Sequence, residues 1–281
     1  MAKSTTQTLT LPRGPVDLGA LDPHGKPGFS GKKAEGKAVL YALGDELSDL
    51  QERLFAEGKS GGSRNLLLVL QGMDTSGKGG ILRHAVGLVD PQGVHIKSFK
   101  APTQAERRHD FLWRVERELP GPGMIGVFDR SHYEDVLIGR VRSLASPEEI
   151  ERRYDEINDF EERLVDAGTT IVKCMLHISR EEQKSRLLAR LDDDTKLWKF
   201  NPGDIDERQH WDDYVAAYEV ALERTNTEHA PWLVVPGDRK WFGKLAVAQV
   251  LLETLAAMNP TWPPPDFDVA DQKARLAPED A

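Results

Sequence analysis

A glycine-rich segment in the first third of the chain carries the residues best suited to phosphate chemistry. It reads GMDTSGKGG from Gly72 to Gly80, with four residues between Gly72 and Gly77 and with Lys78 directly after. This is the spacing of a phosphate-binding loop when a strand precedes it and a helix follows. Glycines let consecutive N–H groups turn toward phosphate oxygens, while the helix N-terminus and the lysine add positive charge. We expect phosphate to contact Lys78 and the loop residues Gly72, Met73, Thr75, Ser76, Gly77, Gly79 and Gly80.

Two positions of this loop depart from the usual pattern. Gly79 stands where a serine or threonine hydroxyl normally binds magnesium, and Asp74 places a carboxylate among groups that bind anions. A carboxylate repels bound phosphate unless a divalent cation lies between them, so we predict that Asp74 is a metal ligand. The alternative is that Asp74 only caps the turn.

A second carboxylate follows an apolar run at residues 124–128. Asp129 ends this predicted strand and Arg130 comes directly after it. In kinases with a phosphate loop, a second magnesium-binding carboxylate lies at the end of a neighbouring strand. We therefore predict that Asp74 and Asp129 hold the metal, and that Lys78 and Arg130 neutralise the phosphoryl group in transfer.

Two basic segments are candidates for contacts with anionic substrates. Residues 95–117 carry a formal charge of +3, although a solvated helix face is the alternative explanation. In residues 184–210, two arginines four positions apart share a helix face, and a flap with an aromatic anchor follows. Such a lid would exclude water from the reaction, whereas a charged surface loop is the alternative. The candidates are Lys100, Thr103, Arg107, Arg108 and Arg114 for the nucleotide, and Arg186, Arg190, Lys196, Lys199 and Arg208 for the phosphate chain.

The elements that must position these residues alternate between strand and helix. Ser146 and Ser179 each precede a glutamate by three residues, which predicts a capping box at the start of a helix. The alternation predicts an α/β fold, a P-loop kinase-like three-layer α/β/α arrangement with a mainly parallel five-stranded sheet and a helical lid. The expected strands are 66–70, 94–99, 124–128, 169–178 and 232–235, and the expected helices are 37–58, 104–119, 147–164, 180–191 and 241–258. A further helix is expected directly after the phosphate loop, with Ile81, Leu82, Ala85, Val86 and Val89 as its apolar residues.

The chain divides by composition into three parts. Four prolines and six glycines interrupt residues 1–36, where we expect an irregular arm, with a disordered tail as the alternative. Residues 37–259 form the predicted catalytic domain, with its lid at about 184–210. Residues 260–281 form a proline-rich acidic tail.

The overall composition excludes several classes of protein. The 281 residues are 39% hydrophobic and 30% charged, which is enough apolar material for a core. No apolar run reaches the roughly 18 residues of a membrane span, and no signal-peptide core is recognisable. A single cysteine, Cys174, permits no internal disulfide, so we expect a soluble cytoplasmic protein with no membrane partner.

The net charge of −9 argues against a nucleic-acid partner but leaves room for a local basic channel. Residues 41–59, 147–166 and 260–281 carry −3, −6 and −3, so the rest of the chain carries +3. Salt screens charges over about 8 Å at physiological ionic strength, so the acidic faces should have little effect on the electrostatic potential in a distant crevice.

Four ordered motifs resemble the polyphosphate kinase 2 family over about residues 40–258. They are GMDTSGKGG, KSFKAPT with the later HDFLWR, VFDRSHYEDVL, and KLWKFNPGDIDERQHWDDY. The SHYEDVL form is similar to the branch often called class III, which phosphorylates AMP as well as ADP.

The resemblance implies a polyphosphate:nucleotide phosphotransferase with inorganic polyphosphate as donor and AMP or ADP as acceptor. It implies Mg²⁺, with Mn²⁺ as a substitute, and a homo-oligomer, either a dimer or a tetramer. It also assigns Asp74 and Asp129 to the metal and the accepting phosphate, Glu134 to the nucleotide, and the basic lid residues to polyphosphate. Transfer is expected to be direct and in line, without a covalent enzyme intermediate.

Two alternatives remain open at this stage. One is an ATP-dependent nucleoside monophosphate kinase of the thymidylate-kinase type, although such a kinase keeps serine or threonine where Gly79 stands. The other is a regulator that binds polyphosphate or nucleotide without turnover. Two carboxylates beside a lysine favour catalysis over passive binding.

Overall fold

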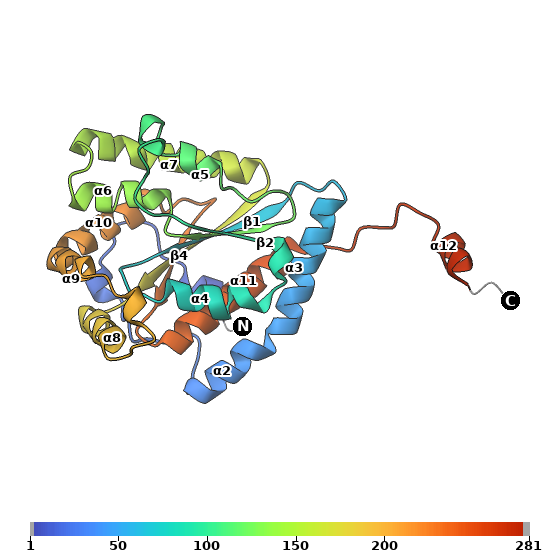
Figure 1. Cartoon of the computed structure of the whole chain (residues 1–281), viewed down its shortest axis with the longest axis horizontal. Helices are drawn as coiled ribbons and strands as arrows, with labels where there is room; N and C mark the ends of the chain where they lie inside the picture. The colour runs from blue at the N-terminus through green and yellow to red at the C-terminus, as the bar shows by residue number, and fades with distance from the viewer. Residues whose placement is uncertain (1–2, 278–281) are drawn as a thin grey trace.

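The computed structural model describes residues 3–277 and contains a single five-stranded sheet (Figure 1). The strand order is β2-β3-β1-β4-β5, and all neighbouring strands are parallel. The predicted fold class is confirmed. The strands are β1 (Asn65–Gln71), β2 (Val94–Ser98), β3 (Ile125–Asp129), β4 (Thr169–His177) and β5 (Trp232–Pro236).

Helices cover both faces of the sheet and complete three layers (Figure 1). Each face has its own apolar core, because residues of β1 alternate between the two sides. On one side lie α1 (Thr5–Leu9), α2 (Lys33–Ala42), α3 (Gly44–Lys59), α4 (Lys78–His84) and α11 (Lys240–Met258). On the other lie α5 (Trp113–Glu116), α6 (Ile138–Val141), α7 (Pro147–Asp166) and α10 (Trp211–Arg224).

The pairing of β1 with β3 brings the two predicted catalytic segments together. Leu70 of β1 is in register with Asp129 of β3, so the phosphate loop and Arg130 leave the sheet at the same edge. Ligands bind at this carboxyl edge in open α/β sheets. Helices α8 (Arg180–Leu191) and α9 (Gly203–Glu207) follow β4 and supply the segment predicted as a lid.

The serine signals locate the starts of two helices correctly. The Ser146 side chain accepts a hydrogen bond from the Glu149 N–H at the start of α7, and Ser179 accepts one from Glu182 at the start of α8. These bonds satisfy backbone donors that have no partner inside the helix.

Three predicted helices are wrong in extent. The helix after the phosphate loop was expected to include Val89, but α4 ends at His84 and a 3-10 turn at Val86–Leu88 follows. The segment 37–58 is two helices, α2 and α3, because the chain breaks at Leu43 before Gly44, a poor helix former. The segment 104–119 holds only a 3-10 turn at Glu106–Arg108 and the short α5. Between them the Asp110 carboxylate accepts the Leu112 N–H, a local bond that competes with a continuous helix.

The N-terminal arm packs against the body of the protein. Leu9, Leu11 and Leu18 are buried, and Thr10 forms an antiparallel bridge with Leu233 of β5. The disordered-tail alternative is therefore wrong for residues 3–36, which include α1 and a 3-10 turn at Leu18–Ala20. At the other end, α12 (Val269–Leu276) lies away from the body on an extended proline-containing segment (Figure 1).

Within residues 3–277, α11 is the one helix with the length and hydropathy of a membrane span. Its side chains Leu245, Val247, Val250 and Leu251 belong to the core that α11 shares with the sheet, α2 and α3. The apolar composition of α11 thus matches its place as a buried helix of the fold.

Candidate functional site

The phosphate loop wraps around its own lysine. Gly77 has a φ of 115° and Thr75 a φ of 64°, so the chain turns back on itself before α4 begins at Lys78. The Lys78 side chain is buried, and its Nζ donates to the Gly72 carbonyl at 2.8 Å. Burial lowers the pKa of Lys78 and the nearby Arg130 lowers it further, while Asp129 and Asp74 act in the opposite direction.

Arg186 holds this loop from the side of α8. Its Nη1 donates to the carbonyls of Thr75 at 2.9 Å and Ser76 at 2.8 Å. Its Nη2 donates to the carbonyls of Gly237 at 2.5 Å and Asp238 at 3.2 Å. The expectation was that Arg186 contacts polyphosphate, but its buried guanidinium is engaged with backbone and thereby joins the phosphate loop to the β5–α11 connection.

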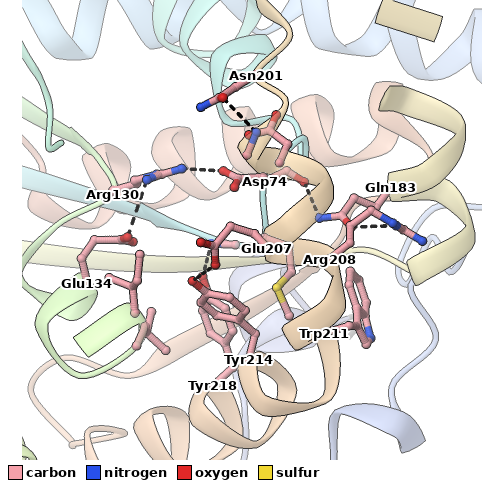
Figure 2. Close-up of a pocket in the computed structure, with 16 residues that line it drawn as sticks. Asp74, Arg130, Glu134, Gln183, Asn201, Glu207, Arg208, Trp211, Tyr214 and Tyr218 are labelled. Carbon is pink, nitrogen blue, oxygen red and sulfur yellow. Dashed lines mark hydrogen bonds and ion pairs between the residues drawn. The ribbon is translucent and has the colours of Figure 1, made fainter. Parts of the chain in front are cut away.

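Asp74 and Arg130 form an ion pair across the carboxyl edge of the sheet. Arg130 Nη2 lies 2.5 Å from Asp74 Oδ1, and Arg130 Nη1 lies 3.8 Å from Glu134 Oε2 (Figure 2). Burial opposes the charge on Arg130, but Glu134 and Asp74 outweigh it and raise the pKa of Arg130. Arg130 has a φ of 65°, a strained conformation for a side chain of this size.

Glu134 is enclosed next to this pair. Burial raises the pKa of Glu134, although Arg130 and Lys78 pull it in the opposite direction. If the Gln71 amide is turned so that both of its polar atoms find suitable partners, Gln71 donates to Glu134 Oε1 at 3.0 Å and accepts from Ser131 Oγ at 3.1 Å. Glu134 is therefore a carboxyl group whose charge depends on the neighbouring cations.

Asp129 lies at the end of β3, where Ser98 Oγ is 3.5 Å from Asp129 Oδ2. Within residues 3–277, no group of three or more His, Cys, Asp or Glu side chains is arranged to hold a metal ion. Magnesium in kinases is commonly held by one or two carboxylates together with substrate phosphates. Asp74 and Asp129, which both lie near Lys78, fit that donor set.

A pocket of about 250 Å³ opens beside the Asp74–Arg130 pair (Figure 2). Four carboxylates and two arginines line it, so its wall is acidic in balance. Glu207 accepts a hydrogen bond from the Tyr214 hydroxyl at 2.7 Å, and Tyr218 accepts one from the Gly72 N–H at 3.0 Å. The charged lining residues are Asp74, Glu134, Asp204, Glu207, Arg130 and Arg208.

The predicted lid residues divide between the pocket and the surface. Arg208 lines the pocket and donates to Gln183 Oε1 at 2.8 Å, while Arg190 donates to the Lys199 carbonyl and to Asp204. Lys196 pairs with Asp193, and the Lys199 ammonium lies 4.9 Å from the Trp198 ring centre. The lid is thus tied together by its own ion pairs.

Most residues predicted for the nucleotide lie outside this pocket. Arg114 is buried and donates to the Lys100 carbonyl at 2.7 Å. Thr103 and Glu106 form a reciprocal cap at the 3-10 turn, and Arg107 donates to the Pro102 carbonyl. Of the six candidates Lys100, Thr103, Arg107, Arg108, Arg114 and Glu134, only Glu134 is among the pocket residues.

The acidic and aromatic wall of the pocket was not predicted from the sequence. Asp204 and Glu207 lie in the segment that was predicted as a lid because of its lysines and arginines. Trp211, Tyr214 and Tyr218 belong to α10. The spacing of the two tyrosines, four residues apart on one helix face, was the available signal.

A basic surface beside the phosphate loop was also missed. It consists of Lys37 of α2, Arg83 of α4, and Lys240 and Lys244 of α11. A methyl group at Gly80 would lie 3.2 Å from Lys244 Cε, so this lysine lies against the first turn of α4. Burial lowers the pKa of Lys244, and the neighbouring cations Lys37, Lys240 and Arg83 lower it further.

Comparisons with known proteins point to one family. The family model described as Polyphosphate kinase 2 matches residues 30–263. An AMP/ADP-polyphosphate phosphotransferase of Meiothermus ruber is 43% identical over 255 residues, which are 91% of this chain and 94% of the relative. An ADP-polyphosphate phosphotransferase of Rhodopseudomonas palustris is 42% identical over 88% of each chain. The crystal structure of polyphosphate kinase 2 from Arthrobacter aurescens TC1 matches with a TM-score of 0.95 and 56% identity, covering 98% of this chain and 97% of that one.

Proposed function

Because the chain belongs to the polyphosphate kinase 2 family, we propose that it transfers the terminal phosphoryl group of inorganic polyphosphate to AMP and to ADP. The observation that carries this proposal is the Asp74–Arg130 ion pair. It joins the phosphate loop to the residue after β3, and both of its members line the acidic pocket. A donor phosphate on the loop and an acceptor phosphate from the pocket would therefore meet at this pair.

Polyphosphate would enter along the basic surface defined above. Its terminal phosphates would bind the loop N–H groups and Lys78, while more distal phosphates would face Lys244 and Lys240. Arg190 and Lys196 of the lid would contact the chain from the opposite side once Asp204 and Asp193 are displaced, and Lys199 would join them on leaving the Trp198 ring. Arg186 would act indirectly, by holding the Thr75 and Ser76 backbone in place.

The nucleotide would occupy the acidic pocket. Asp204 and Glu207 are acceptors suited to ribose hydroxyls or an exocyclic amine, and Trp211 and Tyr214 offer aromatic faces to a base. The acceptor phosphate would then point toward Arg130. Lys100, Arg107 and Arg108 remain candidates for a contact with the nucleotide phosphates from outside the pocket.

Catalysis would rest on position and charge. The transition state of phosphoryl transfer spreads negative charge over the peripheral oxygens, which Lys78 and Arg130 would neutralise. Because the acceptor phosphate is already an anion, no side chain has to remove a proton from it. Closure of the lid around α9 would exclude water and prevent hydrolysis of the donor.

Kinases that act on polyphosphate and nucleotides generally need a divalent metal ion. We propose Mg²⁺, with Mn²⁺ as a substitute, held by Asp74 and Asp129. When bound, the ion would neutralise phosphate charge and relieve the repulsion between Asp74 and the donor.

We further propose that the chain acts in the cytoplasm as a homo-oligomer, either a dimer or a tetramer. The proposed dimer or tetramer is tested by light scattering on the purified chain, which measures the oligomeric state directly.

Burial raises the pKa of the Cys174 thiol to about 12, so this cysteine is protected from oxidation and poorly suited to act as a nucleophile.

A coupled assay with two donors tests the proposed activity. Purified chain with polyphosphate, AMP and Mg²⁺, but without ATP, should form ADP and then ATP. The ATP-dependent alternative is not favoured, since the relatives above are named for polyphosphate. Product from ATP plus AMP, with none from polyphosphate, would overturn the proposal.

A further inference from the structure

A buried group of charged and polar side chains lies behind the segment that carries Arg130 and Glu134. It comprises Glu161 of α7, Lys173 of β4, and His132 and Tyr133 of the 3-10 turn His132–Asp135. Each of these four residues is at most 1% exposed. None of them lines the pocket, so none contacts a substrate there.

Glu161 is the centre of the group. Its Oε1 accepts from the Tyr133 hydroxyl at 2.7 Å and lies 3.3 Å from His132 Nε2, and its Oε2 accepts from Lys173 Nζ at 2.6 Å. Lys173 also donates to the Tyr133 hydroxyl at 2.9 Å and to the Thr225 carbonyl at 2.8 Å. Two oppositely charged groups therefore hold one tyrosine hydroxyl.

The Tyr133 ring is fixed as firmly as its hydroxyl. It meets Trp232 of β5 edge to face, with ring centres 4.7 Å apart. The Lys173 ammonium lies 5.4 Å from the Tyr133 ring centre and 5.0 Å from that of Trp232. Tyr133 is thus held by α7, β4 and β5 together, which leaves it little freedom to move.

A buried ion pair is a poor source of stability, because apolar residues of the same volume usually serve as well or better. Such a pair can instead specify one conformation. The conformation at stake here is that of Arg130, which has a φ of 65° and needs support from its surroundings. The Ser131 hydroxyl accepts from the Tyr133 N–H at 3.2 Å, so the fixed tyrosine also fixes the start of the turn.

We propose that Glu161 and Lys173 are positioning residues for phosphoryl transfer, which hold Tyr133 and thereby keep Arg130 and Glu134 in place around Asp74. This inference rests on the activity proposed above. Neither residue touches a reacting atom, and both act through the 130–134 segment. Their loss should therefore reduce kcat, while donor binding at the basic surface is retained.

The test removes both charges together, since a single substitution would leave one buried charge without a partner. The variant is Glu161→Gln with Lys173→Met, and its matched control is Glu151→Gln with Arg224→Met at an exposed ion pair. Displacement of a catalytic arginine by a fraction of an ångström should lower kcat by about 10- to 100-fold. The KM for polyphosphate should stay unchanged, and the control pair should match wild type in both parameters.

A double-mutant cycle separates positioning from general damage to the fold. In an Arg130→Lys background, the Glu161/Lys173 substitution should cause little further loss of kcat, because the group it positions is already altered. Tyr133→Phe removes the shared hydroxyl and is expected to fold even if the double variant does not. It should lower kcat in the wild-type background but hardly at all with Arg130→Lys.

The outcomes distinguish the two claims. An inactive wild type would overturn the proposed function and this inference with it. An active wild type whose folded Tyr133→Phe or double variant keeps the full kcat would overturn this inference alone. Losses that multiply fully in the Arg130→Lys background would also overturn it, because the pair would then act on the fold in general.

Discussion

Arg186 offers a sharp test of how the phosphate loop is held. The Arg186→Lys substitution keeps the positive charge but replaces a planar fork with a single ammonium group. In the protein this guanidinium reaches the loop carbonyls of Thr75 and Ser76 and also the carbonyls of Gly237 and Asp238. One ammonium cannot reach both pairs, so about two buried carbonyls should lose their partner.

The expected loss follows from the cost of such groups. A buried polar group without a partner costs about 1–3 kcal/mol, so the loss of two partners should lower the free energy of unfolding by about 2–6 kcal/mol. For a chain of this size each kcal/mol lowers Tm by about 2–4 °C. Urea unfolding followed by circular dichroism measures the first quantity, and a thermal scan measures the second. The turnover number should fall as well, because the loop N–H groups lose their alignment.

Arg190→Lys is the matched control, four residues along the same helix. Arg190 is partly exposed and contacts only the Lys199 carbonyl and Asp204, which a lysine can still reach. This control should unfold like wild type. If Arg186→Lys instead keeps wild-type stability and raises the KM for polyphosphate, then Arg186 binds the donor and the reasoning is refuted.

Three further predictions concern the charged groups at the reaction centre. Asp74→Asn should lower kcat by about 100-fold or more while leaving Tm within the range of wild type, and full activity with polyphosphate and Mg²⁺ would contradict the assignment. The pKa of Glu134 is raised, so its carboxylate is lost as pH falls through a value above 4.5, and Arg130 then loses a partner. The acidic limb of the kcat/KM profile, which reports the free enzyme, should therefore disappear in Glu134→Gln, and a persisting limb would assign it to another group. The pKa of Lys78 in the free enzyme is lowered, so its positive charge is lost as the pH rises, at a pH below 10.5. The value of kcat/KM for polyphosphate should decline over this alkaline limb, and Lys78→Arg should move the limb to higher pH. An alkaline limb that Lys78→Arg leaves unmoved would contradict this.

The fold was predictable wherever local chemistry and tertiary packing agree. The five predicted strand segments became five parallel strands, and Ser146 and Ser179 marked helix starts because a capping hydroxyl acts within its own turn. The prediction of one helix over residues 104–119 was wrong because the sequence pattern does not reveal that the Asp110 carboxylate accepts a hydrogen bond from the backbone N–H two residues later. Gly44 similarly divides a segment whose apolar spacing continues through it.

The site was predictable only where one segment carries the chemistry. The loop 72–80 and Arg130 could be proposed because short motifs mark them, and the strand order then places both at the carboxyl edge of the sheet. The burial of Arg186 and Arg114 depends on elements distant in the chain, and an arginine bound to carbonyls has the same spacing as one that binds substrate. The acidic wall at Asp204 and Glu207 was not predicted, because both residues lie in a segment that was interpreted from its lysines and arginines.

Phosphorus NMR of a single reaction mixture tests the central claim most directly. Purified chain would be incubated with polyphosphate, AMP and Mg²⁺, and the terminal and internal phosphate signals would be followed over time. The account predicts that the β-phosphate signal of ADP appears as polyphosphate shortens, with no matching release of free phosphate, and that Asp74→Asn abolishes this signal. Release of free phosphate without nucleotide product, or the same nucleotide signal from Asp74→Asn, would contradict it.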